Sequence, residues 1–227
     1  MKAMILAAGH GTRMRPLTDH TPKPLLIVGG KPLIQWHIEN LQQAGIEDIV
    51  INIAWLGEQI PTVLGDGSNY GVSLHYSDEQ SEGALETAGG IIKALPLLGN
   101  EPFLVVNGDV WCNFNYSNAS PLKNDDLAHL ILVKNPSHNP KGDFSINQDN
   151  NRVRDGGENA CTFSGIGYYH PDLFKSLNYG KRPLAPILRE AMLAGQVSGE
   201  LYKGDWRDIG TPERLQELDE ELFNSSN

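Results

Sequence analysis

Short apolar segments alternate with amphipathic helical segments along the first 133 residues, and this alternation restricts the fold more than any other feature. Each apolar segment has the length of one buried strand, and the segments between them carry helical spacing or helix boundaries. Strands that alternate with helices predict an α/β fold, a Rossmann-like and mostly parallel sheet with helices on both faces. The expected strands are Ala3–Ala7, Asp48–Ala54, Val72–Ser77, Phe103–Asn107 and Ala128–Val133, and the expected helices are Lys31–Ala44, Gly57–Leu64 and Ala88–Leu95.

The second half of the chain is less regular. A hairpin is expected from Asp143–Asn147 to Arg152–Val153, followed by a strand at Cys161–Tyr169. A helix is expected at Leu184–Ala194, and a terminal helix after Thr211, which suits an N-cap because Pro212 follows it. The final Ser-Ser-Asn is expected to fray. We expect residues 1–227 to form one domain, whose first half binds a nucleotide and whose second half shapes a second substrate pocket.

Charge is distributed unevenly along the chain. The formal net charge is −10, which argues against nucleic acid or an anionic membrane surface as a partner. Residues 1–31 nevertheless contain five Lys and Arg residues against one acid, Asp19, so this segment carries about +4 by the count of its charges. A local cationic cluster on an acidic protein favours a small anionic ligand.

The remaining composition suggests a cytoplasmic protein. No apolar run approaches the ~20 residues that span a bilayer, and the apolar start is too short for a secretory signal. The two cysteines, Cys112 and Cys161, lie far apart and form no CxxC pair, so we expect reduced thiols without a metal or disulfide role.

The sequence LAAGHGTRMRPLT, at residues 6–18, places a glycine-rich loop directly after the first expected strand. Met14 occupies the third glycine position of the dinucleotide fingerprint, and the Gly-Lys-Ser/Thr of a P-loop is absent. The strand lysine and the HRD motif that accompany the glycine-rich loop of protein kinases are absent too. Gly9 and Gly11 would let the backbone approach phosphate, and Arg13 would add a fork of donors.

A lysine between two prolines follows this loop in the sequence TPKPLL. The prolines are expected to hold Lys23 in an extended, rigid segment, so that its ammonium group has a fixed origin. A surface turn with solvated arginines would explain an isolated Gly-x-Gly, but it does not explain a rigid lysine so close by. The combination indicates a phosphate-binding site.

The run LAAGHGTRMRPLTDHTPKPLL resembles the signature of the sugar-1-phosphate nucleotidylyltransferases. The residues of several further segments are most similar to those of the N-acetylmuramate α-1-phosphate uridylyltransferases of bacterial cell-wall recycling. His10 departs from the lysine, or other small or basic residue, usual in that loop. The supporting segments are LETAGGI at 85–91, VNGDV at 106–110, GDFSI at 142–146, TFSGIGYYHP at 162–171 and WRDIGTPERL at 206–215.

The resemblance implies a reaction between two phosphates. An oxygen of a sugar 1-phosphate attacks the α-phosphorus of a nucleoside triphosphate, and pyrophosphate leaves. By resemblance Lys23 bridges phosphates and Arg13 neutralises the triphosphate, and both are assigned as catalytic. The remaining nucleotide contacts implied by the resemblance are the backbone of Ala8, Gly9, Gly11 and Thr12, and a base-reading loop with Glu82, Thr87 and Gly90.

Two carboxylates are the expected ligands of Mg²⁺, which prefers oxygen. Asp109 follows the apolar strand FLVVNG, where its alternative role is that of a strand-end turn residue. Asp208 precedes the terminal helix, where it could instead pair with Arg207 or Arg214. The resemblance assigns both aspartates to the metal, with Asp205 as a rival for the second position.

The sugar side of the site is less defined by motif. Gly142 resembles the family glycine whose NH meets the sugar. Asn107 lies two residues before Asp109, and its side chain could hydrogen-bond the acetamido group or a hydroxyl of the sugar. The chain lacks the Glu-Lys-Pro segment whose glutamate grips sugar hydroxyls in some relatives, and Glu158 is the acid available as a substitute.

The expected activity is therefore Mg²⁺-dependent uridylyl transfer from UTP to N-acetylmuramate α-1-phosphate, by a monomer or a weak homodimer. Mannose-1-phosphate guanylyltransferase and glucose-1-phosphate thymidylyltransferase activities stay open as alternatives. So do a cytidylyltransferase acting on a non-sugar phosphate and a catalytically silent nucleotide-sugar sensor, although the combination of Arg13, Lys23, Asp109 and Asp208 argues against the sensor.

Overall fold

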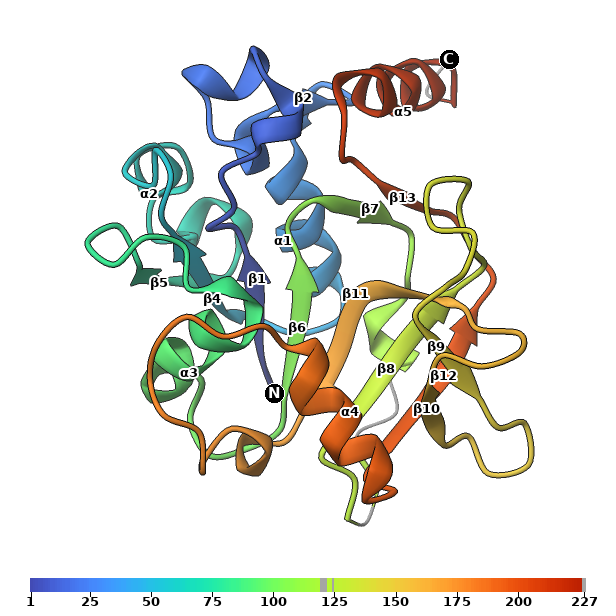
Figure 1. The fold of residues 1–227 in the computed structure, drawn as a ribbon. Helices are drawn as coiled ribbons and strands as arrows, with labels where there is room; N and C mark the ends of the chain where they lie inside the picture. The colour runs from blue at the N-terminus through green and yellow to red at the C-terminus, as the bar shows by residue number, and fades with distance from the viewer. Residues whose placement is uncertain (119–121, 124, 226–227) are drawn as a thin grey trace.

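The computed structural model describes residues 1–118, 122–123 and 125–225. Its centre is a seven-stranded sheet with the strand order β12-β8-β11-β6-β1-β4-β5 (Figure 1). The expected fraying of the chain's end falls partly on residues 226–227, outside the described part. The strands are β1 Lys2–Leu6, β4 Asp48–Ile53, β5 Ser73–Asp78, β6 Phe103–Asn107, β8 Ala128–Val133, β11 Thr162–Tyr169 and β12 Val197–Tyr202.

The sheet is mostly parallel, as the sequence predicts. β1 pairs in parallel with β4 and β6, β4 with β5, and β8 with β12. Only β11 among these seven strands runs against its neighbours, since it pairs antiparallel with both β6 and β8. The carboxyl ends of β1, β4 and β6 therefore lie at one edge of the sheet, where open α/β sheets place their ligands.

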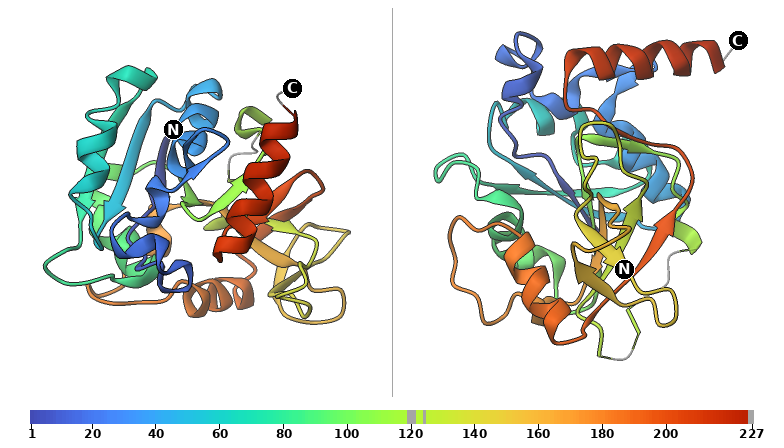
Figure 2. Two further views of the ribbon diagram at one scale, coloured as in Figure 1. Left: turned by 90° about the horizontal axis from the view of Figure 1, so that it is seen from above. Right: turned by 45° about the vertical axis from the view of Figure 1, so that its right-hand side comes forward.

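Helices cover both faces of the sheet (Figures 1 and 2). Side chains alternate along β1, so Ala3 and Ile5 join one buried cluster and Met4 joins the other. The first cluster includes residues of α1 (Leu33–Gln43) and α2 (Gln59–Leu64), and the second includes residues of α3 (Glu86–Leu98) and α4 (Ala185–Leu193). The predicted fold class is confirmed.

The last helix, α5 (Pro212–Ser225), belongs to a third buried cluster with residues from the beginning of the chain. Leu215 and Leu218 pack there with Met14 and Val28, so α5 lies against the segment that follows β1 (Figure 2). The predicted cap forms, since Thr211 Oγ1 accepts a hydrogen bond from the Arg214 NH at 3.5 Å. Helix α5 thus starts at a fixed point beside the opening loop.

Several elements differ from the sequence predictions. Lys31–Pro32 is not the start of a helix: it forms strand β3, paired antiparallel with β2 (Ile27–Val28), and the helix begins at Leu33. Strand β12 and the ladder between β7 (Val110–Cys112) and β13 (Trp206–Asp208) were not predicted. The expected hairpin forms from β9 (Phe144–Ile146) and β10 (Val153–Asp155).

None of the described helices has both the length and the apolar character that crossing a membrane requires.

Candidate active site

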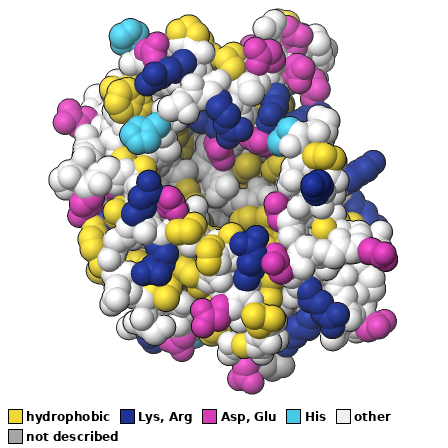
Figure 3. Space-filling model, in the orientation of Figure 1, with side chains coloured by type: hydrophobic (Ala, Val, Ile, Leu, Met, Phe, Trp, Pro, Cys, Tyr) yellow, Lys and Arg dark blue, Asp and Glu magenta, His cyan; other side chains and the backbone are white. Residues whose placement is uncertain are grey.

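A cavity of about 340 Å³ lies at the carboxyl ends of β1, β4 and β6. Figure 3 shows this face hollowed at its centre, with acidic and basic side chains around the hollow. The predicted nucleotide loop, Asn107 and Asp109 all line the cavity. The lining residues are Leu6–Met14, Lys23, Pro24, Asn52, Glu79, Ala84, Glu86, Thr87, Asn107–Asp109 and Gly210.

The opening loop leaves β1 and turns at Gly11, whose φ of 61° lies in the left-handed region. A Cβ atom at Gly11 would lie 2.9 Å from Thr18 Cγ2 and 3.3 Å from Lys23 Cβ. The Thr18 hydroxyl also donates to the Gly11 carbonyl at 2.8 Å. Glycine at this position therefore lets the loop pack directly against the segment that carries Lys23.

Lys23 reaches the cavity from a short turn. The expectation of an extended segment is wrong in part: Pro22 is extended, but Lys23–Leu25 form a 3₁₀ turn. Only 8% of Lys23 is exposed, and its Nζ donates to Asp109 Oδ2 at 2.9 Å. The turn and the burial still give the ammonium group a fixed origin, as the two prolines predicted.

Asp109 and Asp208 meet through the β7–β13 ladder, although 98 residues separate them in the chain. Asp208 pairs in register with Val110, and the Ile209 NH donates to the Asp109 carbonyl at 2.9 Å. Asp205 lies further along, where its carbonyl accepts from the Asn113 NH. The structure thus brings Asp208 beside Asp109 and leaves Asp205 away from it.

Arg13 approaches the same point from the opening loop. A Cβ atom at Gly210 would lie 3.2 Å from Arg13 Nη1 and 3.0 Å from Asp208 Oδ1. Arg15 points elsewhere and pairs with Asp19 at 3.2 Å. Arg13, Lys23 and Asp109 therefore line the cavity near Gly210, and Asp208 lies directly behind that residue.

The donor set fits a magnesium ion that is shared with substrate phosphates. Within the described residues, no group of three or more His, Cys, Asp and Glu side chains forms a complete metal cage. Mg²⁺ usually takes one or two protein carboxylates and completes its coordination with water and phosphate oxygens. Asp109 and Asp208 are the two carboxylates that would take this role, and Lys23 donates a hydrogen bond to Oδ2 of Asp109.

The base-reading residues are only partly brought to the cavity. Thr87 lines it, but Glu82 lies outside, where it accepts hydrogen bonds from Lys93 and from the Tyr179 hydroxyl. Gly90 lies behind the wall: a Cβ atom there would approach Glu79 Oε1 to 2.7 Å and Asn52 Nδ2 to 2.9 Å. Gly90 therefore makes room for a buried pair and does not itself face the cavity.

That buried pair, Asn52 and Glu79, was missed by the sequence analysis. Asn52 Oδ1 accepts from the Ala7 NH at 2.8 Å, and Asn52 Nδ2 donates to Glu79 Oε1 at 2.7 Å. Glu79 Oε2 accepts from the Leu85 NH at 2.8 Å, which connects the opening loop to the base loop. Burial raises the pKa of Glu79, while the hydrogen bonds from Leu85 and Asn52 oppose that rise. A single polar residue inside the apolar run DIVINIA was the signal available for Asn52.

Two glycine substitutions separate these roles. Gly9 has nothing within 4 Å of its Cβ position and no positive φ, so Gly9→Ala should leave the melting temperature unchanged. The same substitution should raise the KM for the nucleotide, because the added methyl group would lie where the backbone is expected to approach phosphate.

Gly90→Ala should destabilise the protein by about 1–3 kcal/mol, because its methyl group overpacks Asn52 and Glu79. Thermal unfolding together with steady-state kinetics measures both effects. A stable Gly90→Ala variant with a raised KM would instead place Gly90 in the nucleotide site.

The predicted sugar residues are dispersed. Asn107 lines the cavity and packs against Gly165, whose Cβ position lies 2.6 Å from Asn107 Cγ. Gly142 lies on the loop after β8, and its NH already donates to the Asn139 carbonyl at 3.2 Å. Glu158 is exposed in the turn before β11. Only Asn107 of these three residues therefore lines the cavity.

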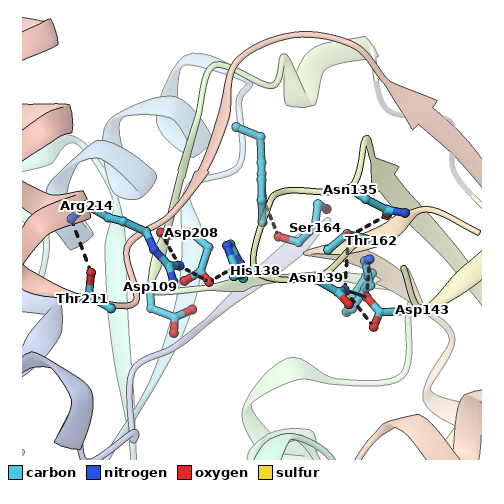
Figure 4. Close-up of polar contacts among 12 residues, drawn as sticks. Asp109, Asn135, His138, Asn139, Asp143, Thr162, Ser164, Asp208, Thr211 and Arg214 are labelled. Atoms are coloured by element: carbon cyan, nitrogen blue, oxygen red, sulfur yellow. Dashed lines mark hydrogen bonds and ion pairs between the residues drawn. The ribbon is translucent and has the colours of Figure 1, made fainter. Parts of the chain in front are cut away.

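His138 and Arg214 are two further residues that the site analysis of the sequence missed. His138 Nε2 lies 3.0 Å from Asp208 Oδ2, and Arg214 Nη1 donates to the same oxygen at 2.8 Å (Figure 4). The sequence analysis considered Arg214 only as the ion-pair partner that would make Asp208 structural. The structure contains that ion pair and still places Asp208 beside Asp109.

Comparison with known proteins agrees with this geometry. A Neisseria meningitidis serogroup B protein named N-acetylmuramate alpha-1-phosphate uridylyltransferase is 56% identical over 223 residues, covering 96% of each chain. A Caulobacter vibrioides protein of the same name is 32% identical and covers 93% of this chain and 92% of its own. A solved Bacillus anthracis structure described as a glucose-1-phosphate thymidylyltransferase superimposes with a TM-score of 0.82 at 25% identity, covering 98% of this chain and 95% of its own.

A family model for nucleotidyl transferases matches residues 2–225, which is nearly the whole chain. The chain therefore belongs to the nucleotidyl transferase family, and the family predicted from its opening motif is confirmed.

Proposed function

We propose that this protein transfers the uridylyl group of UTP to N-acetylmuramate α-1-phosphate, giving UDP-N-acetylmuramate and pyrophosphate. The observation that carries the proposal is that Lys23, Arg13 and Asp109 line one part of the cavity, with Asp208 directly beside it. The 56% identity to a relative named for this reaction supports the choice of substrates. The reaction would serve the recycling of cell-wall fragments in the cytoplasm.

The chemistry requires that two anions approach each other. Repulsion between phosphates is the main barrier, so positioning and positive charge contribute more than covalent chemistry does. Lys23 would hold phosphate oxygens from its buried turn, and Arg13 would take up charge on the departing pyrophosphate. The attacking phosphate is already ionised at neutral pH, so the site needs no general base.

Asp109 and Asp208 would hold Mg²⁺ between them and the substrate phosphates. When bound, the ion would neutralise phosphate charge and help to align the reacting groups. The backbone of Gly9–Thr12 would bind the triphosphate, and Thr87 would lie near the base. We assign the first half of the single domain to the nucleotide and the second half, with Asn107 between them, to the sugar phosphate. We propose a monomer or a weak homodimer as the active form.

The test is an activity matrix of UTP, GTP, dTTP and CTP against N-acetylmuramate, N-acetylglucosamine, glucose and mannose 1-phosphates. Pyrophosphate release should be strongest for UTP with N-acetylmuramate 1-phosphate, because a relative 56% identical is named for that pair. The same matrix without Mg²⁺ should be inactive. Turnover confined to GTP with mannose 1-phosphate would overturn the uridylyl assignment but not the family, and nucleotide binding without any turnover would point to a sensor.

A further inference from the structure

The carboxylate of Asp208 is held asymmetrically. Arg214 Nη1 and His138 Nε2 both contact Oδ2, at 2.8 Å and 3.0 Å (Figure 4). Oδ1 has no hydrogen-bond partner among the described residues, and it lies 3.0 Å from the Cβ position of Gly210, a residue that lines the cavity. The side chain is therefore held at one oxygen, and the other oxygen lies next to a residue that lines the cavity.

Arg214 approaches Asp208 from a rigid support. It occupies the first turn of α5, where Thr211 caps the helix. Its Nη1 also donates to the Asp208 carbonyl at 3.3 Å, so one guanidinium nitrogen contacts both the backbone and the side chain. The Arg214 side chain is mostly buried, with 27% exposed. These contacts fix the orientation of Asp208 relative to α5.

His138 approaches Asp208 from the side opposite to Arg214. It lies on the loop after β8, and hydrogen bonds of amide, hydroxyl and carboxylate side chains hold this loop in place. Asn135 Nδ2 donates to the Ala160 carbonyl at 2.8 Å, and the Thr162 hydroxyl donates to Asn135 Oδ1 at 2.9 Å. Asn139 Nδ2 donates to Asp143 at 3.2 Å, and Asp143 Oδ2 accepts from the Phe163 NH at 2.8 Å. The loop is thereby pinned to the start of β11 (Figure 4).

We propose that His138 and Arg214 are positioning residues, which hold Asp208 Oδ2 so that Oδ1 is presented to the metal ion. The inference rests on the proposed function, which assigns Asp208 to magnesium. Mg²⁺ demands nearly ideal geometry from its ligands, so a carboxylate that rotates freely binds it less well. Partners that orient a ligating side chain commonly alter metal affinity by about 10- to 100-fold when removed.

The contacts to Asp208 can affect metal affinity in two opposite ways: they can compete with the metal for the carboxylate, or they can position the carboxylate for the metal. If the two side chains merely competed with the metal for Asp208, removing either contact would strengthen metal binding, most of all the guanidinium of Arg214. If they position the carboxylate, removing either one weakens metal binding, in Arg214→Ala even though a repelling positive charge is lost. We expect positioning to dominate, because both contacts are made to Oδ2 and leave Oδ1 available.

The test measures Mn²⁺ binding to the whole protein by electron paramagnetic resonance of the free ion, without substrates. Arg214→Ala and His138→Ala should each raise the dissociation constant for Mn²⁺ by about 10-fold or more. His138→Gln should restore most of the affinity, because its side-chain NH₂ can donate from a similar position. The Mg²⁺ concentration that gives half-maximal turnover should rise in parallel, whereas kcat at saturating Mg²⁺ should recover.

Arg207→Ala is the matched control. Arg207 precedes Asp208 on β13 but pairs with Glu221 and Asp205, so its removal should leave Mn²⁺ affinity unchanged. Unchanged or tighter Mn²⁺ binding in both alanine variants would overturn the positioning role. Failure of the wild-type protein to turn over any nucleotide with any sugar phosphate would instead overturn the proposed function, a result that the binding measurement does not depend on.

Discussion

Asp109→Ala should reduce uridylyl transfer by roughly 10³-fold or more while UTP still binds. Asp109 lies at the end of the cavity, whereas the backbone of the opening loop is built on β1 and Gly11 and does not depend on this carboxylate. Removing the carboxylate would take away the proposed metal ligand and release Lys23, which would stay available for phosphate. Steady-state kinetics and calorimetric titration of UTP measure the two effects separately.

Asp205→Ala is the matched control for this experiment. Asp205 is an exposed acid of the same neighbourhood, and its side chain pairs only loosely with Arg207 at 3.7 Å. Its removal should change turnover by less than about twofold, because exposed ion pairs of this kind contribute little. Equal losses of binding and turnover in Asp109→Ala would count against a metal role and favour a structural one.

The opening loop and its strand could be predicted from sequence because their signals are local. An apolar run, two glycines, an arginine and a lysine between prolines all occur within the first 24 residues. The turn at Gly11 requires its positive φ and close packing on Thr18 and Lys23, which only glycine meets without strain. A steric requirement of this kind can be recognised in the sequence, because it shows as a glycine at that position.

Strand β12 could not be predicted this way, because its residues gain their place from partners elsewhere. The segment VSGELY contains a glycine and no continuous apolar run. Gly199 is needed there since a Cβ atom would lie 2.7 Å from Val153 Cγ2 and 2.8 Å from the Leu130 carbonyl oxygen. Parallel pairing with β8 supplies the hydrogen bonds, and tertiary pairing of this kind overrides local propensity.

The site shows the same division between local and distant signals. The pairing of Asp109 with Asp208 depends on the β7–β13 ladder, so resemblance to a family indicated it and spacing did not. The glutamates near the predicted base-reading loop show where sequence prediction stops. The sequence predicts Glu82 as the residue that contacts the base, but Glu79 is the glutamate that is buried and lines the cavity. Asn52 and the space over Gly90 decide which acid turns inward, and neither contact is visible from the loop's own sequence.

Lys23→Met should slow turnover by about 10²- to 10³-fold with the fold intact. Methionine keeps most of the buried alkyl stem that packs beside Gly11, and it removes the ammonium group, which contacts Asp109 and is proposed to bind the substrate phosphates. Asp109 loses its partner, but 39% of its side chain is exposed, so water can solvate the carboxylate. Initial rates and thermal unfolding should therefore report a large loss of activity and a small change in melting temperature.

Lys31→Met tests whether any lysine of the cationic first segment would have the same effect. Lys31 pairs with Glu39 and lies 3.6 Å over the Trp36 ring, outside the cavity lining, so its removal should leave turnover close to wild type. Lys23→Arg keeps the charge but not the compact ammonium group, and only partial activity is expected because the buried turn fits a point charge. Turnover near wild type in Lys23→Met would mean that the triphosphate is held without this lysine, and the positioning argument for the TPKP segment would fail.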